Sequence, residues 1–313
     1  MAKVLDRPAL RFTPERVPAG QPVIVRGMGA GLPRLLAAFT EERGGVFTRD
    51  GHGRVAYLPG GGEPIVHVGS GRGVPYRTAI SYPLKAGPVP APRFATPARL
   101  PRRVSRWRRE VWPHVAKDLA YAYYHELING HPGRVRMSWD EFAAAYTAEE
   151  WDGKEMRALI RRAVPRFADR LAFGRLDRPL DGIKFGDPAG LRRWMHGYLD
   201  ADLARRTDQA HSADLALAVA ARTLRDTLDE DTHGDPWLDG FTRYVNHGPS
   251  PDWLPRLQAL AAEGVVVFAG ADLQVRPDDR GTWRAVSGTL PGGVKALVAL
   301  DVRGIVEKQE EYR

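Results

Sequence analysis

The chain has 313 residues, a formal net charge of +8, 43% hydrophobic and 27% charged residues, and no cysteine. This length and balance exclude a wholly disordered chain and a small disulfide-stapled fold. Without cysteine there is no disulfide, thiolate metal site or cysteine nucleophile. This is typical of a reducing compartment, so we expect a cytoplasmic protein. The basic excess favours phosphate-bearing partners without choosing among nucleotides, nucleic acid and anionic lipid.

No membrane or export signal is visible in the sequence. Residues 1–7 lack the apolar run of a secretory signal, and no stretch approaches the roughly 18 apolar residues of a membrane helix. We therefore expect no membrane partner.

The first predicted unit is a strand, a glycine turn and a helix. Residues 22–26 form a short apolar run typical of a buried strand, and glycines at 27, 29 and 31 follow it. Apolar side chains then recur at helical spacing, at Leu32, Leu35, Leu36 and Phe39. This order is typical of a dinucleotide-binding α/β unit.

The elements that follow divide the chain into three parts. We predict strands at 46–48, 55–58 and 64–68, with a hairpin around Gly60–Gly62, and then a proline-rich linker or crossing segment at 83–101. Helical periodicity runs over 105–263. Helix N-termini in this range are predicted at Ser138, at Asp187 before Pro188, and at Ser212. Strand patterns return at 265–268, 273–275, 283–286 and 296–300.

The predicted fold class is therefore α/β, a Rossmann-like dinucleotide-binding sheet with a large, mainly helical insertion. The predicted divisions are an α/β part with its proline-rich linker at 1–100, a helical domain at 101–263, and strands returning to the sheet with a polar tail at 264–313.

The glycine turn carries the main chemical hypothesis. Gly27, Gly29 and Gly31 let the backbone approach a pyrophosphate, and the N–H groups opening the helix supply anion donors. The spacing departs from Gly-x-Gly-x-x-Gly, because Leu32 stands where the third glycine belongs. A glycine turn that merely joins strand to helix is the alternative. Arg49 and Asp50 follow about 20 residues later, so NAD and NADP both stay open.

A second glycine-rich loop at 69–76 carries Arg72, which could contact phosphate or flavin; the alternative is a solvent loop. Arginines at 102, 103, 106, 108 and 109 surround Trp107. We interpret them as the solvent-exposed face of a helix, and we expect no nucleic-acid partner. Metal-ligand spacing and a Gly-x-Ser-x-Gly elbow are both absent, so no metal site is predicted. We assign the aromatic residues around Trp112 and Tyr121–Tyr124 to the core.

Several stretches together resemble the long actinobacterial proteins known as FAD/NAD(P)-binding domain-containing proteins. The stretches run in family order from about Pro22 to Arg303, and they are 22–29 with 43–45, 69–76, 109–113 with 123–124, 176–180, 211–216 and 247–249. The resemblance implies a flavin-fold scaffold in which the turn at Gly27 is a second, internal dinucleotide motif. Family members are longer, and they open with a Gly-x-Gly-x-x-Gly motif that binds FAD. The chain is expected to match an internal portion lacking that motif and the C-terminal part.

The resemblance leads to the hypothesis of a truncated or split FAD/NAD(P)-binding oxidoreductase. FAD and/or NAD(P) are the expected cofactors, at Gly27, Gly29 and Gly31, with Arg43, Asp50 and Arg72 as further cofactor contacts. The reaction would be hydride transfer to a flavin, and no catalytic acid or base can be named. A partner chain could supply the missing FAD segment. The alternatives are a non-catalytic partner- or nucleotide-binding module and a basic nucleic-acid-associated protein.

Overall fold

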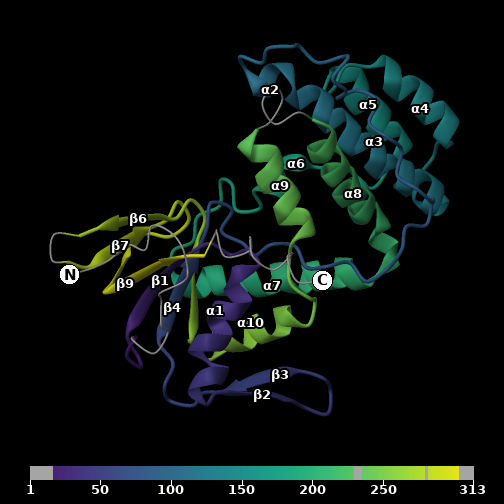
Figure 1. Ribbon diagram of the computed structural model, residues 1–313. Coiled ribbons are helices and arrows are strands. Elements are labelled where there is room, and N and C mark those ends of the chain that lie inside the picture. Colours follow the sequence, from purple (N-terminus) through teal and green to yellow (C-terminus); the bar gives the residue numbers. More distant parts are fainter. Residues whose placement is uncertain (1–16, 229–234, 279–280, 303–313) are drawn as a thin grey trace. The chain divides into compact units, whose positions relative to one another are not determined.

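The computed structural model describes residues 17–228, 235–278 and 281–302 (Figure 1). Contacts group the chain into two compact units. The sheet unit comprises 1–78, 174–203 and 247–313, and the helical unit comprises 79–173 and 204–246. Segments 174–203 and 247–263, which the sequence analysis assigned to the helical domain, thus group with the strands.

The strands, all in the sheet unit, are β1 (Pro22–Arg26), β2 (Val46–Arg49), β3 (Val55–Leu58), β4 (Ile65–Gly69), β5 (Val266–Gly270), β6 (Gln274–Pro277), β7 (Trp283–Val286), β8 (Val294–Ala296) and β9 (Val298–Asp301). The α-helices are α1 (Gly31–Phe39), α2 (Trp107–Glu110), α3 (Trp112–Gly130), α4 (Trp139–Ala148), α5 (Lys154–Ala163), α6 (Phe173–Asp177), α7 (Pro188–Thr207), α8 (Ser212–Thr227), α9 (Pro236–Asn246) and α10 (Trp253–Ala262). Short 3₁₀ turns are η2 (Glu41–Arg43), η3 (Pro132–Arg134), η4 (Phe167–Asp169) and η5 (Gln209–His211).

The centre of the sheet unit is a parallel sheet with strand order β5-β4-β1-β9. Val23 pairs with Val66 on β4 and with Val298 on β9, so β1 is flanked on both sides. Such strands are buried on both faces, which explains the continuous apolar run of β1. This mixed α/β architecture with a parallel sheet is compatible with the predicted Rossmann-like fold.

A second, antiparallel sheet of β6, β7 and β8 packs on one face of the parallel sheet. Its Trp283 and Ala285 share a core cluster with Ile24 of β1 and Ala299 of β9. Because side chains alternate along a strand, Ile24 faces this layer while Val23 and Val25 face the opposite side. The parallel sheet is therefore covered on the Ile24 face by strands.

The predicted hairpin around Gly60–Gly62 is wrong. β3 pairs antiparallel with β2, Val46 opposite Leu58, and β4 joins the parallel sheet beside β1. The backbone at Gly60 instead passes close to the backbone at Gly44. A methyl group on Gly60 would lie 2.6 Å from the carbonyl carbon of Gly44. The β2–β3 hairpin is thus an insertion between the first two strands of the parallel sheet.

The core of the helical unit lies where α3 packs against α8, and α8 packs in turn against α9. Almost the whole of α3 from Val115 to Ile128 is buried. The aromatic residues assigned to the core are mostly inside it: Tyr121, Tyr123 and Tyr124 are buried, and Trp112 is half-buried.

The proline-rich segment at 83–101 is held down by two carboxylates of α3. Glu126 accepts the N–H groups of Lys85 and Ala86 at 2.6 and 3.0 Å. Asp118 accepts the N–H groups of Arg93, Phe94 and Ala95 at 2.7–3.0 Å. Two helical turns separate these acids, so they lie on one face of α3 and bind the crossing segment along its length.

The helix-start predictions differ in outcome. Ser138 caps α4 by accepting the N–H of Glu141, and Asp187 accepts the N–H of Gly190 in the first turn of α7. Ser212, by contrast, is the first residue of α8, and its hydroxyl donates to Glu126 at 2.5 Å instead of capping the helix. Its capping prediction is wrong, because a buried carboxylate competes for the hydroxyl.

Among the described residues, every helix is too short or too polar to span a lipid bilayer.

Candidate functional site

The glycine turn lies at the carboxyl edge of the parallel sheet, directly after β1. The N–H of Gly27 donates to the carbonyl of Gly69 at 2.8 Å, which ties the turn to the end of β4. Gly27 has a φ of 120°, a conformation that residues with a side chain rarely adopt. Glycine at 27 is thus required by the backbone itself.

The turn presents backbone donors that the protein does not use. Leu32 N–H is bonded to the carbonyl of Gly29 at 3.0 Å. Within the described residues, no acceptor is found for the N–H groups of Met28, Gly29 or Ala30. Ala30 is the N-cap of α1, so no side-chain oxygen caps the first N–H groups of this helix. Unpaired donors at a helix N-terminus are an anion-binding arrangement, since the helix dipole also favours negative charge there.

Gly29 is required for a different reason, the close approach of Tyr76. A methyl group at position 29 would lie 3.0 Å from Cζ and 3.1 Å from Cε2 of the Tyr76 ring. The N–H of Tyr76 also donates to the carbonyl of Met28 at 2.9 Å. The loop after β4 is therefore anchored onto the turn after β1. Gly31 is the buried first residue of α1.

The position of the turn in the sheet suits a ligand. β4 and β5 lie on one side of β1 and β9 lies on the other, and the chain leaves β1 toward the β4 side. Open α/β sheets bind ligands outside the carboxyl ends of their strands, which is the edge where the turn lies. On its two sides lie Arg26 and Asp301, whose charged atoms are 3.9 Å apart.

The loop after β4 is rigidly held against the end of β5. Ser70 Oγ accepts the N–H of Gly73 at 2.9 Å, and Ser70 N–H donates to the carbonyl of Gly270. Gly69 and Gly73 pack directly on the backbone of Gly270 and Ala271, with no room for side chains. A solvent loop would not be fixed in this way.

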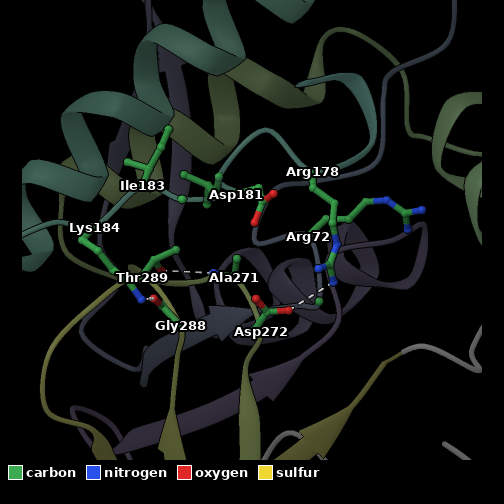
Figure 2. A pocket seen from close by; sticks show the side chains of 12 residues that line it. Arg72, Arg178, Asp181, Ile183, Lys184, Ala271, Asp272, Gly288 and Thr289 are labelled. Atoms are coloured by element: carbon green, nitrogen blue, oxygen red, sulfur yellow. Dashed lines mark hydrogen bonds and ion pairs between the residues drawn. The ribbon is translucent and has the colours of Figure 1, made fainter. Parts of the chain in front are cut away.

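Arg72 lies at a cavity of about 140 Å³ beside this loop (Figure 2). Its guanidinium donates to Asp177 Oδ1 from Nε at 2.9 Å and from Nη2 at 2.6 Å. Arg178 and Lys184 also line the cavity, with Asp181 and Asp272 as its acidic residues. Arg178 pairs with Asp272 at 3.2 Å, and Lys184 binds the carbonyl of Gly288. The cavity therefore gathers three cations from two chain segments.

Arg43 and Asp50 lie apart from these groups. Arg43 donates to the carbonyls of Val17 and Gly62 at 2.9 and 2.6 Å, which fastens η2 to neighbouring loops. Asp50 is exposed in the β2–β3 turn, where it accepts the N–H groups of His52 and Arg54. Their predicted cofactor roles stay predictions, and a local structural role accounts for the contacts of each.

Three parts of the site carry no signal in the local sequence. Tyr76 was seen only as part of the glycine-rich loop, and its packing on Gly29 carries no local signal. Asp177 is 105 residues from Arg72, so their pairing could not be inferred. Arg178 and Lys184 enter the cavity on a segment without periodicity. Within the described ranges, no cluster of three histidine or acidic side chains could hold a metal ion.

Sequence comparison finds relatives among N-monooxygenases, which are oxidoreductases. The chain is 32% identical over 314 residues to an L-aspartate N-monooxygenase (nitrosuccinate-forming) of Streptomyces davaonensis, covering 92% of this chain and 47% of the relative. It is 30% identical to the enzyme of the same name from Streptomyces cremeus, over 91% of this chain and 46% of that relative. It is 27% identical to nitrosuccinic acid synthase npaA of Aspergillus oryzae, over 87% of this chain and 44% of that relative.

The chain spans about half the length of the curated relatives it matches. No family model matches it. The similarity fits an FAD-binding family in general terms, and the expectation that the chain is an internal portion of an actinobacterial family member stays a prediction.

Proposed function

We propose that this chain is the dinucleotide-binding part of a flavin-dependent oxidoreductase, with NADP(H) bound at the turn after β1. The observation that carries the proposal is the set of three backbone N–H groups, at Met28, Gly29 and Ala30, that no described acceptor satisfies. A pyrophosphate has the charge and the acceptor oxygens that such a set requires. Gly29 and Ala30 are small and half-buried.

The choice of NADP(H) rests on the strand next to β1. In doubly wound sheets an acidic residue after the first βαβ unit binds the ribose 2′-hydroxyl, whereas an arginine there accommodates a 2′-phosphate. Here that strand is β4, and Ser70 and Arg72 follow it. Arg178 and Lys184 also line this cavity, but Asp177, Asp181 and Asp272 match the three cations in charge, so the choice rests on Arg72 itself. This arrangement favours a 2′-phosphate over a free hydroxyl.

The oxidoreductase assignment is supported by the relatives and by the resemblance to FAD/NAD(P)-binding proteins. The relatives' names describe oxidation at the nitrogen of aspartate, so N-oxidation of an amino-acid amine is the proposed reaction class. When bound, the reduced nicotinamide supplies a hydride for the flavin. This chain's own residues bind and orient the cofactor: the turn holds the pyrophosphate and the β4 loop holds the ribose. Participation of a partner chain remains a prediction.

The proposal is tested by cofactor titration of the purified chain. A ligand that binds only the folded state must raise the midpoint of thermal unfolding. We expect NADPH to raise it more than NADH, and isothermal titration to give a matching order of affinities. A protein whose melting temperature ignores NADPH, NADH and FAD alike would refute the proposal.

Ala30→Asp makes this test specific to the turn. A carboxylate at a helix N-terminus is favourable to the fold, whereas it would repel a phosphate from the same donors. We expect the variant to remain folded and to lose NADPH binding. Ala262→Asp adds the same charge at an exposed residue of α10 and should bind NADPH like the wild type.

A further inference from the structure

We propose that the arginine-rich segment around α2, with the tryptophans on which it packs, is a docking surface for an acidic segment of a protein partner. This α2 surface consists of residues 102–110 with Trp112 and Trp237. All of these residues belong to the helical unit. The inference is independent of the cofactor, whose proposed site is in the sheet unit.

The first argument is unbalanced charge. Five arginines and one glutamate give residues 102–110 a net charge of +4, half of the +8 of the whole chain. All five arginines are exposed, at positions 102, 103, 106, 108 and 109. None of them forms an ion pair with an acidic side chain in the part of the chain that the structure describes. Such a cluster of like charges attracts a partner of opposite charge.

The acidic side chains beside this surface are used within the fold. The carboxylate of Glu110 accepts the N–H and the hydroxyl of Ser105 at 2.9 and 2.8 Å. These hydrogen bonds, with a smaller contribution from Arg106, hold the pKa of Glu110 below its ordinary value. Asp235, just before α9, accepts the N–H of Trp237 at 2.6 Å. A carboxylate that pairs with the exposed arginines therefore has to come from a partner.

The second argument is the aromatic packing of Arg108. Its guanidinium carbon lies 5.7 Å from the ring centre of Trp112 and 5.5 Å from that of Trp237. The two rings meet edge to face with their centres 4.5 Å apart, and both are half-buried. Contact with the rings restricts the guanidinium, whose planar set of N–H donors matches a carboxylate. Less conformational freedom is then lost when a partner binds.

The third argument favours a protein over a nucleic acid. Tryptophan and arginine are enriched among the residues that dominate binding energy between proteins. Proteins that bind single strands instead stack bases on aromatic rings. In the α2 surface Trp237 already stacks on Phe241, with ring centres 4.8 Å apart. Trp107 is buried, and Arg108 lies over Trp112. The surface thus has a half-buried apolar centre and a charged rim, as protein interfaces do.

The test is fluorescence anisotropy of a labelled oligoglutamate peptide titrated with the whole chain. We expect salt-dependent binding that the double variant Arg108→Gln/Arg109→Gln weakens about tenfold or more, since hydrogen bonds between charged groups are lost. Glutamine keeps part of the side-chain stem, so the thermal midpoint without peptide should stay close to that of the wild type. Arg102→Gln/Arg103→Gln lies outside the helices and should weaken binding as well, which keeps the test valid if Arg108 also supports the fold.

Arg161→Gln/Arg162→Gln is the matched control. It also removes two consecutive exposed arginines from the last turn of a helix of the helical unit, so its net charge is the same. It should bind the peptide like the wild type. Equal losses in this pair and in Arg108→Gln/Arg109→Gln would overturn the inference, because net charge alone would then attract the peptide.

Two further outcomes would overturn the inference. One is a wild type that does not bind the peptide. The other is labelled oligothymidylate, or vesicles containing phosphatidylserine, that bind more tightly than the peptide and lose binding only in Arg108→Gln/Arg109→Gln. The α2 surface would then serve a nucleic acid or a lipid surface.

Discussion

The guanidinium of Arg72 binds one carboxylate oxygen of Asp177 through both Nε and Nη2. Both side chains are largely buried, at 21% and 13% exposure. Asp177 therefore holds Arg72 at the edge of the cavity, and it also offsets the positive charge that a 2′-phosphate would meet.

This pairing makes Arg72 the test of nucleotide preference. We expect Arg72→Gln to weaken NADPH binding about tenfold or more while leaving NADH binding close to wild type, since only NADPH carries the 2′-phosphate. Calorimetric titration with both nucleotides measures the difference. Arg178→Gln, at the same cavity but 52% exposed, should have a smaller effect. An equal loss for both nucleotides would show that Arg72 acts only through the fold.

The contact between Gly29 and Tyr76 predicts a coupled pair of mutations. Gly29→Ala should destabilise the protein, by about 1–3 kcal/mol, because its methyl group meets the tyrosine ring. The same change in a Tyr76→Ala background should cost less, since the ring is gone. Urea unfolding of the two single variants and the double variant gives the coupling energy. Strict additivity would show that the packing of Tyr76 is not what requires glycine at 29.

Glu126 is predicted to be a stability residue of the helical unit. Its buried carboxylate accepts the N–H groups of Lys85 and Ala86 and the hydroxyl of Ser212. Glu126→Gln replaces one acceptor oxygen by a donor and should cost about 2–4 kcal/mol in unfolding free energy. Glu155→Gln, an exposed residue of α5, should cost under about 0.5 kcal/mol. Equal midpoints in chemical denaturation would contradict this role.

Asp169 predicts a pH dependence. A hydrogen bond from Arg134 is the main cause that holds the pKa of Asp169 below its ordinary value. A carboxylate with a lowered folded-state pKa stabilises the fold above its unfolded pKa, and that stability is lost as pH falls through the folded value. The difference in unfolding free energy between wild type and Asp169→Asn should thus be constant near neutral pH and shrink below about pH 4.

Urea titrations from pH 3 to pH 7 would measure this difference. Asp140→Asn, at an exposed position of α4, serves as the control and should show little pH-dependent change. If the difference between wild type and Asp169→Asn grew on acidification, the sign of the proposed coupling would be wrong.

Local sequence was sufficient to predict the strand, turn and helix around Gly27. The reason is that each part has a local cause: an apolar run for a strand buried on both faces, glycine for a positive φ, and a helical period for α1. Ser138 and Asp187 were found at helix starts because a capping side chain acts on residues three positions away. The donors of the turn follow from the same local pattern.

Other features were decided by tertiary structure. Asp50 was predicted at the nucleotide because it lies about 20 residues after the turn. The β2–β3 hairpin occupies that interval, and the strand beside β1 is β4, which Ser70 and Arg72 follow; the cofactor role of Asp50 stays a prediction. Strand order depends on which edges meet in space, and the sequence of a short apolar run does not specify its neighbour. Ser212 likewise binds a carboxylate 86 residues away instead of its own helix.

The sequence by itself determined that the chain contains an α/β unit with a glycine turn between its first strand and helix, because helix period, strand burial and glycine conformation are local properties. Only the tertiary structure decided what surrounds that turn. Tyr76 packs on Gly29 and Asp177 binds Arg72 because the carboxyl ends of parallel strands gather loops that are far apart in the chain. The proposed choice of nucleotide depends on those loops.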